Sequence, residues 1–124
     1  MTDTSVRSQR AHRASVEVAT SDMAQYLREV LGPKLTAYIA DVADQKAVGR
    51  WASGTRKPQP RAEERLRSAY AVFHLLQSAE SPHTVRAWMV GLNPQLDDES
   101  PATVLREGRF KDVLAAARAF LAGG

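Results

Sequence analysis

The sequence predicts an all-α protein. Apolar residues recur at helical spacing along most of its 124 residues, and no segment shows the apolar-polar alternation of a half-buried strand. Proline and glycine divide the periodic segments into short helices. The hydrophobic fraction of 44% and the charged fraction of 25% are ordinary for a folded globular protein, so these helices are expected to pack around one continuous core.

The N-terminal residues 1–20 are rich in Ser, Thr, Arg and Ala and lack an apolar stripe, which predicts a flexible basic arm. The three arginines Arg7, Arg10 and Arg13 would be able to reach phosphates. A solvated tail without a role is the alternative interpretation.

Two helices are predicted after this arm. The first is expected to begin after Ser21 or Asp22, both good N-terminal caps, and to end at Gly32 and Pro33. The second has four apolar residues at helical spacing: Leu35, Tyr38, Ile39 and Val42.

A third short helix completes a helix-turn-helix that spans roughly Leu35 to Ser53. After a turn at Ala43, Asp44 is able to cap this helix, and Gly54 is a natural C-terminal stop. In such a motif the second helix enters the major groove of DNA, and inward apolar residues lock the two helices together. The residues expected to do so are Ile39, Val48 and Trp51. The segment Thr55 to Pro60 is predicted to be a basic loop.

Four further helices are predicted. The longest has an apolar stripe over about five turns, made of Ala62, Leu66, Ala69, Tyr70, Phe73 and Leu76. Ser81-Pro82 and Ser100-Pro101 each open a helix, the first carrying Leu92 and stopping at Asn93-Pro94, the second closing at Gly108. The last helix should run from Arg109 to about Leu121 and bury Phe110, Val113, Leu114, Ala117 and Leu121.

The charge is unevenly distributed along the chain. Residues 34–67 contain eight Lys or Arg against four Asp or Glu, whereas residues 80–124 contain five against six. A locally basic surface favours a polyanionic partner such as DNA. The expected base readers are Gln45, Lys46, Gly49 and Arg50, with Arg56 and Lys57 holding phosphates. A helical hairpin with solvated charges is the alternative.

The composition argues against an enzyme. The chain has no cysteine and only three scattered histidines, so neither a disulfide framework nor a metal site is expected. It has no nucleophile with a base and no phosphate-binding glycine loop, and no cofactor is expected. No apolar run approaches the roughly 20 residues that a bilayer requires, and the N-terminus lacks the apolar core of a secretory signal, which favours a cytoplasmic protein.

Two stretches resemble a known family. Asp44 to Pro60, D-Q-K-A-V-G-R-W-A-S-G-T-R-K-P-Q-P, resembles the Xre-type helix-turn-helix. Arg86 to Pro94, R-A-W-M-V-G-L-N-P, together with Ser100 to Gly108, S-P-A-T-V-L-R-E-G, looks like the toxin-binding C-terminal domain of the Xre/MbcA/ParS antitoxin family. The resemblance covers residues of about 35 to 122, and its C-terminal pattern is the more specific part.

The resemblance implies a helix-turn-helix domain over residues 21–79 and a small helical toxin-binding domain over 80–124. Such antitoxins form dimers or larger assemblies with a RES-domain toxin that consumes NAD or uses it to modify a target, and their C-terminal region covers the toxin's NAD-binding cleft. Autorepression through operator DNA would accompany this role. The positions that define the C-terminal domain are Trp88, Asn93, Pro94, Pro101, Leu105 and Gly108. Toxin contacts are expected at Arg109, Phe110, Lys111, Phe120 and Leu121, because an apolar C-terminal end can plug a cleft.

Two alternatives remain open at this point. The chain would be a stand-alone transcriptional regulator if its C-terminal helices only dimerise it. It would be a pure protein-interaction module if the helix-turn-helix no longer binds DNA, since Val42 stands near the position where an Xre turn often has glycine.

Overall fold

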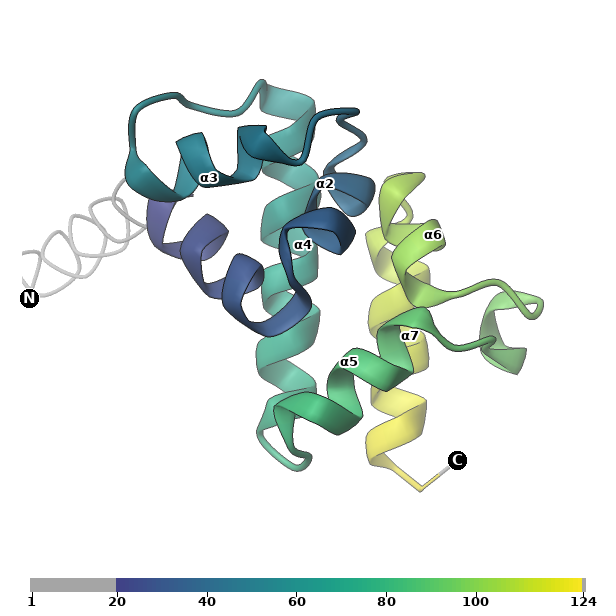
Figure 1. Ribbon diagram of the computed structural model, residues 1–124. Coiled ribbons are helices and arrows are strands. Elements are labelled where there is room, and N and C mark those ends of the chain that lie inside the picture. The colour runs from purple at the N-terminus through teal and green to yellow at the C-terminus, as the bar shows by residue number, and fades with distance from the viewer. Residues whose placement is uncertain (1–19, 124) are drawn as a thin grey trace, which may run out of the picture.

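The computed structural model describes residues 20–123, and every regular element in that range is a helix (Figure 1). Within the described residues the N-terminal helix covers 20–31, and it is followed by α2 (Pro33–Ala40), α3 (Lys46–Ser53), α4 (Pro60–Gln77), α5 (Pro82–Val90), the 3-10 helix η1 (Pro94–Leu96), α6 (Pro101–Arg106) and α7 (Phe110–Leu121). Within residues 20–123 there is no strand, only an isolated antiparallel bridge between Asn93 and Glu99. The all-α prediction is confirmed.

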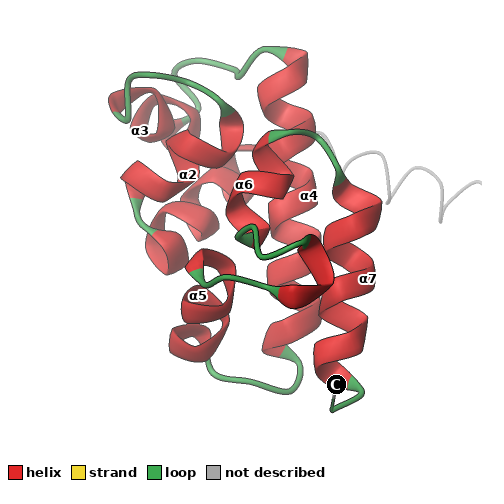
Figure 2. Cartoon of the chain, turned by 90° about the vertical axis from the view of Figure 1, so that its right-hand side faces the viewer, coloured by secondary structure: helices red, strands yellow, loops and turns green. Residues whose placement is uncertain are grey.

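The long helix α4 is the central packing element, as its apolar stripe predicts. It contacts α2, α5, α6 and α7, and it runs beside α7 in both side views (Figure 1, Figure 2). Its inward face is fully buried at Leu66, Ala69, Val72, Phe73 and Leu76. Helices from both halves of the chain therefore pack on one scaffold.

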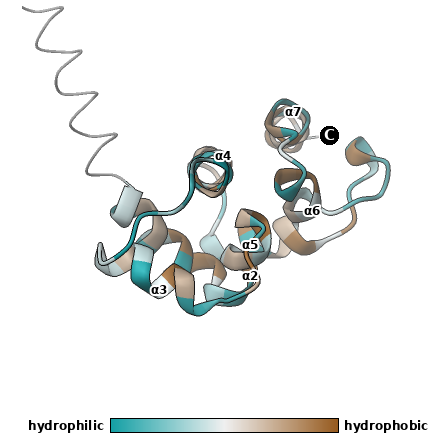
Figure 3. Cartoon of the chain, turned by 90° about the horizontal axis from the view of Figure 1, so that it is seen from above, coloured by the Kyte–Doolittle hydropathy of each residue, from teal (hydrophilic) through white to brown (hydrophobic). Residues whose placement is uncertain are grey.

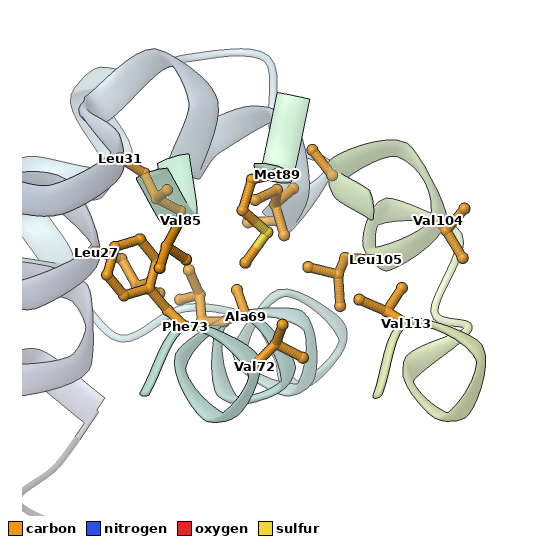
Figure 4. Close-up of a cluster of buried hydrophobic side chains, with 14 of the residues drawn as sticks. Leu27, Leu31, Ala69, Val72, Phe73, Val85, Met89, Val104, Leu105 and Val113 are labelled. Carbon is orange, nitrogen blue, oxygen red and sulfur yellow. The ribbon is translucent and has the colours of Figure 1, made fainter. Parts of the chain in front are cut away.

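The buried side chains form one hydrophobic core (Figure 4). Leu27 comes from the N-terminal helix and Phe73 from the central α4, whereas Met89, Leu105 and Val113 come from α5, α6 and α7. Burying a side chain of this size stabilises the fold by about 1.5–3 kcal/mol. Because both halves contribute, losing α7 would uncover the core of the whole molecule.

Two serine-proline pairs open helices as the sequence predicts. The Ser81 side chain accepts a hydrogen bond from the backbone N–H of Thr84 at 3.2 Å, and Ser100 accepts one from Thr103 at 3.1 Å. A proline at the first helical position follows each cap, where its missing N–H costs nothing. These local rules set the starts of α5 and α6.

The helix limits differ from prediction in three places. Residues 20–22 are already helical, so Ser21 and Asp22 are not caps; Thr20 Oγ1 donates a hydrogen bond to Glu63 Oε1 at 2.9 Å and ties this end to α4. Helix α2 ends at Ala40, which leaves Val42 in the turn. Helix α5 ends at Val90 because Gly91 is extended.

Two leucines are more exposed than the helical pattern predicts. Leu92 follows the end of α5 and is 80% exposed. Leu121 is 36% exposed because it lies in the last turn of α7, beyond the buried Ala117. The predicted arm falls outside the described residues except for Thr20, which is helical. None of the described helices combines the length and apolarity needed to cross a bilayer.

Candidate functional site

The turn between α2 and α3 is made by an aspartate rather than a glycine. Asp41 adopts the left-handed conformation with φ 62°, which aspartate tolerates better than most side chains. The backbone N–H groups of Asp41 and Val42 donate to Tyr38 O and Ala37 O, both at 3.1 Å. Val42 itself needs no positive φ, so valine at this position does not disturb the turn.

The α2 and α3 helices are locked together by the predicted apolar residues. Ile39, Val48 and Trp51 are 1%, 0% and 4% exposed, which confirms their inward orientation. The Asp44 carboxylate accepts a hydrogen bond from the backbone N–H of Lys46 at 2.9 Å, so Asp44 caps the first turn as predicted. Gly54, with φ 77°, ends α3.

The predicted DNA-binding residues all lie on α3 or beside it. Gln45, Lys46, Arg50, Arg56 and Lys57 are exposed, and Gly49 is half-buried. Arg50 Nη2 lies 3.6 Å from Asp44 Oδ2 in a solvent-exposed ion pair. Such pairs are worth less than about 1 kcal/mol, so a stronger anionic partner would displace the carboxylate.

The predicted toxin-binding residues form two separate groups on α7. Arg109 and Lys111 are exposed at its start, where Phe110 packs against the core. Phe120 and Leu121 lie at its end. A helix rises about 1.5 Å per residue, so the 12-residue α7 keeps the two groups roughly 16 Å apart.

Ion pairs fix Arg109 at the start of α7. Its Nε donates to Asp112 Oδ2 at 2.9 Å and its Nη1 to Glu107 Oε1 at 3.1 Å. The hydrogen bond to Asp112 raises the pKa of the Arg109 guanidinium above its usual range. Arg109 is therefore a permanent and oriented cation on the surface.

A hollow of about 300 Å³ with both polar and apolar lining lies beside the end of α7, and the sequence did not predict it. It is lined by Trp88, Leu92, Asn93, Pro94, Gln95, Ala116 and Phe120. The ring centroids of Trp88 and Phe120 are 6.2 Å apart. The W-x-x-x-x-N-P stretch carries the signal for this feature, because its tryptophan, asparagine and proline all line the hollow.

Comparisons with known proteins decide the family. No family model matches the chain. The chain is 31% identical over 87 residues to a probable mycobacterial cidal antitoxin of Mycobacterium tuberculosis, and the match covers 70% of this chain and 73% of the relative. The chain belongs to the family of mycobacterial cidal antitoxins, the MbcA type. The predicted resemblance to Xre/MbcA/ParS antitoxins is confirmed.

A solved structure agrees with this assignment. One chain of the crystal structure of the M. tuberculosis MbcT-MbcA toxin-antitoxin complex superposes on the present protein with a TM-score of 0.71 at 27% sequence identity. The match covers 83% of the present protein and 94% of the chain from the complex.

The motif positions of the antitoxin's C-terminal segment build its local structure. The Asn93 side chain accepts a hydrogen bond from the Gln95 N–H at 2.9 Å and caps η1. Pro101 and Leu105 are buried. Gly108 has φ 80°, and a Cβ there would lie 2.7 Å from Arg65 Nη2. Glycine is therefore favoured at this position by its positive φ, and an added Cβ would also force the Arg65 guanidinium to shift.

Arg106 joins the antitoxin's C-terminal segment to the helix-turn-helix. Its Nη2 lies 2.7 Å from Asp41 Oδ1, and its Nη1 donates to Tyr38 O at 3.0 Å. The guanidinium also lies 4.5 Å from the centroid of the Tyr38 ring. The left-handed residue of the turn is thus held by a side chain 65 positions later in the chain.

Among residues 20–123 of the antitoxin, no group of three or more His, Asp or Glu residues is arranged to hold a metal ion.

Proposed function

We propose that this antitoxin neutralises a NAD-consuming RES-domain toxin by covering the toxin's active-site cleft with its C-terminal helices. It acts by binding rather than by catalysis. The observation that carries the proposal is the match to a chain of the MbcT-MbcA toxin-antitoxin complex over 94% of that chain. A RES-type toxin encoded beside this antitoxin would support the pairing, and its absence would favour a stand-alone regulator.

The C-terminal end of α7 is suited to a protein partner. Leu121 is partly exposed, and Phe120 lines the hollow beside α7 together with Trp88 and the highly exposed Leu92. Apolar and aromatic side chains in a central patch supply most of the binding energy of protein interfaces. The hollow and the end of α7 would therefore form the centre of the contact, with Arg109 and Lys111 at its polar rim.

The toxin test uses surface substitutions, because deleting α7 would remove the buried Val113 and Ala117 and uncover the faces of α4 and α6 on which α7 packs. The assay measures the rate of NAD loss caused by the toxin encoded beside the antitoxin, at increasing concentrations of antitoxin. We expect Leu121→Asp to weaken inhibition by at least roughly tenfold, or about 1.4 kcal/mol, because a carboxylate would have to be desolvated in the contact.

Two further variants locate the contact. Val90→Asp is the matched control, since Val90 is a 54% exposed apolar residue on α5, outside the predicted set. Lys111→Glu tests the other end of α7. If Leu121→Asp leaves inhibition unchanged and Val90→Asp abolishes it, the toxin does not bind at the end of α7.

We also propose that α3 binds operator DNA, so that the antitoxin represses its own operon. The basic residues of α3 and its following loop are exposed, as contact with DNA requires. Figure 1, Figure 2 and Figure 3 place α3 and the C-terminal end of α7 on opposite sides of the molecule. The two proposed partners would therefore not compete for one surface, and a dimer or larger complex with toxin would present more than one α3.

The DNA test measures binding to a duplex that carries the antitoxin's own promoter region. Arg50→Ala and Lys46→Ala should each weaken binding by roughly 1–3 kcal/mol through loss of a base or phosphate contact. Arg118→Ala, in the last turn of α7, is the matched control. Unchanged binding in both α3 variants would remove α3 as the reading helix and leave a protein-interaction module.

A further inference from the structure

We propose that Arg28, on the N-terminal helix, is an additional DNA-contacting residue that forms a seat for one backbone phosphate together with α3. The inference rests on the proposed binding of operator DNA. The seat is a hollow of about 250 Å³ lined by Arg28, Pro33, Gln45, Lys46 and Gly49. Three of these residues are DNA-binding candidates from the sequence, whereas Arg28 lies 21 positions before Gly49 and carries no local signal.

Glycine at position 49 makes room for this hollow. A Cβ at Gly49 would lie 3.9 Å from Arg28 Nη1, which is an ordinary van der Waals distance. The guanidinium of Arg28 therefore lies beside α3 where that helix has no side chain of its own. A ligand group entering there would meet a cation from each side, Arg28 on the N-terminal helix and Lys46 on α3.

The two cations of the hollow are available for an anion. Among the described residues, neither Arg28 nor Lys46 forms an ion pair, whereas Arg61 and Arg106 both pair with Asp41. Glu29, the neighbour of Arg28, accepts a hydrogen bond from Gln25 Nε2 at 3.0 Å. Uncompensated cations on an exposed surface favour an anionic partner.

The side chains must supply this attraction, because the first backbone N–H groups of α3 are already engaged. Lys46 N donates to the Asp44 carboxylate at 2.9 Å, and Ala47 N and Val48 N donate to Asp44 O and Gln45 O. An arginine fork with a neighbouring ammonium matches a phosphate that presents two oxygens. The hollow adjoins the proposed reading face, so the phosphate is assigned to the backbone of the bound duplex.

The experiment measures the affinity for the promoter duplex by fluorescence anisotropy over a series of salt concentrations. Each phosphate that a protein neutralises adds about 0.9 to the slope of log K against log[salt]. We expect Arg28→Ala to lower the magnitude of this slope by about one and to weaken binding roughly eightfold at 0.1 M salt. The loss should be similar for operator and unrelated duplexes, because phosphate contacts carry no base information.

Two controls separate a phosphate contact from a structural role. Arg28→Lys keeps the charge and should retain the wild-type slope, while Arg118→Ala removes a cation from α7 and should also retain it. Toxin inhibition should be unaffected by Arg28→Ala. A wild-type slope in Arg28→Ala, or an equal reduction of the slope in the Ala and Lys variants, would overturn the proposal. Wild-type antitoxin that does not bind the duplex would instead overturn the proposed operator binding.

Discussion

Gly49 lowers the stability of α3, but it leaves room for the proposed phosphate contact. It lies inside α3, where alanine is favoured by about 1 kcal/mol, and a Cβ would have room. We predict that Gly49→Ala raises the free energy of unfolding by about 0.5–1 kcal/mol in urea denaturation. The same methyl group would fill part of the phosphate seat and weaken binding to the promoter duplex. A gain in stability with unchanged DNA affinity would contradict this role.

Gly108 is favoured for a different reason. Its φ is 80°, and a Cβ would displace Arg65, a 9% exposed residue whose Nε donates to Arg106 O at 2.9 Å. We predict that Gly108→Ala lowers the free energy of unfolding by about 2–3 kcal/mol, through strain and a disturbed, partly buried hydrogen bond.

The matched control for this prediction is Gly54→Ala. Gly54 has a similar φ of 77°, but nothing lies within 4 Å of the added Cβ. It should therefore cost only the conformational strain, about 1 kcal/mol. Equal losses at the two sites would show that Arg65 accommodates the methyl group.

At the scale of the element, α3 depends on its cap. This helix has only eight residues, and isolated helices of that length are marginal in water. We predict that Asp44→Ala lowers the free energy of unfolding by about 0.5–2 kcal/mol, because the Lys46 N–H loses its acceptor. Asp44→Asn keeps a side-chain oxygen and should lose much less. Thermal melts of the two variants make the comparison.

At the scale of the whole molecule, Arg106 connects the two halves of the antitoxin. Its contacts with Asp41 and Tyr38 hold the turn that positions α3. We predict that Arg106→Ala lowers the free energy of unfolding by about 1–2 kcal/mol and weakens DNA binding through a looser turn. Arg109→Ala is the stability control, since among the described residues Arg109 pairs only with its sequence neighbours Glu107 and Asp112 on the surface, and its loss should leave the free energy of unfolding almost unchanged. Equal losses of stability in Arg106→Ala and Arg109→Ala would show that the contacts of Arg106 with Asp41 and Tyr38 contribute no more than a surface ion pair.

One shared core also predicts one cooperative transition. Leu105 is fully buried on α6, so Leu105→Ala should lower the free energy of unfolding by about 2–5 kcal/mol. Trp51 and Trp88 report on the first and second halves of the chain. Single-tryptophan variants, Trp51→Phe and Trp88→Phe, should each show the same midpoint shift when Leu105→Ala is added. A shift seen only by Trp88 would mean that residues 80–124 unfold as a separate unit.

Local sequence signals were sufficient to predict most of the helices and their limits. The caps at Asp44, Ser81 and Ser100 act within three residues, and Gly54 ends α3 through its own backbone. The helical spacing of apolar residues likewise predicted that Val48 and Trp51 face the core. Such features depend on neighbours one helical turn away, which is why reading the chain in order recovers them.

Contacts between distant segments could not be read in this way. Arg106 reaches Asp41 and Arg28 reaches Gly49 because helix packing brings them together, and no spacing along the chain encodes either contact. The exposure of Leu92 was missed for the same reason: a helical stripe shows which side is apolar, but the packed neighbours determine where burial ends. The amino-acid order therefore specified the helices and the family, while long-range packing determined the link between Arg106 and Asp41, the hollow between Arg28 and α3, and the exposure of Leu92.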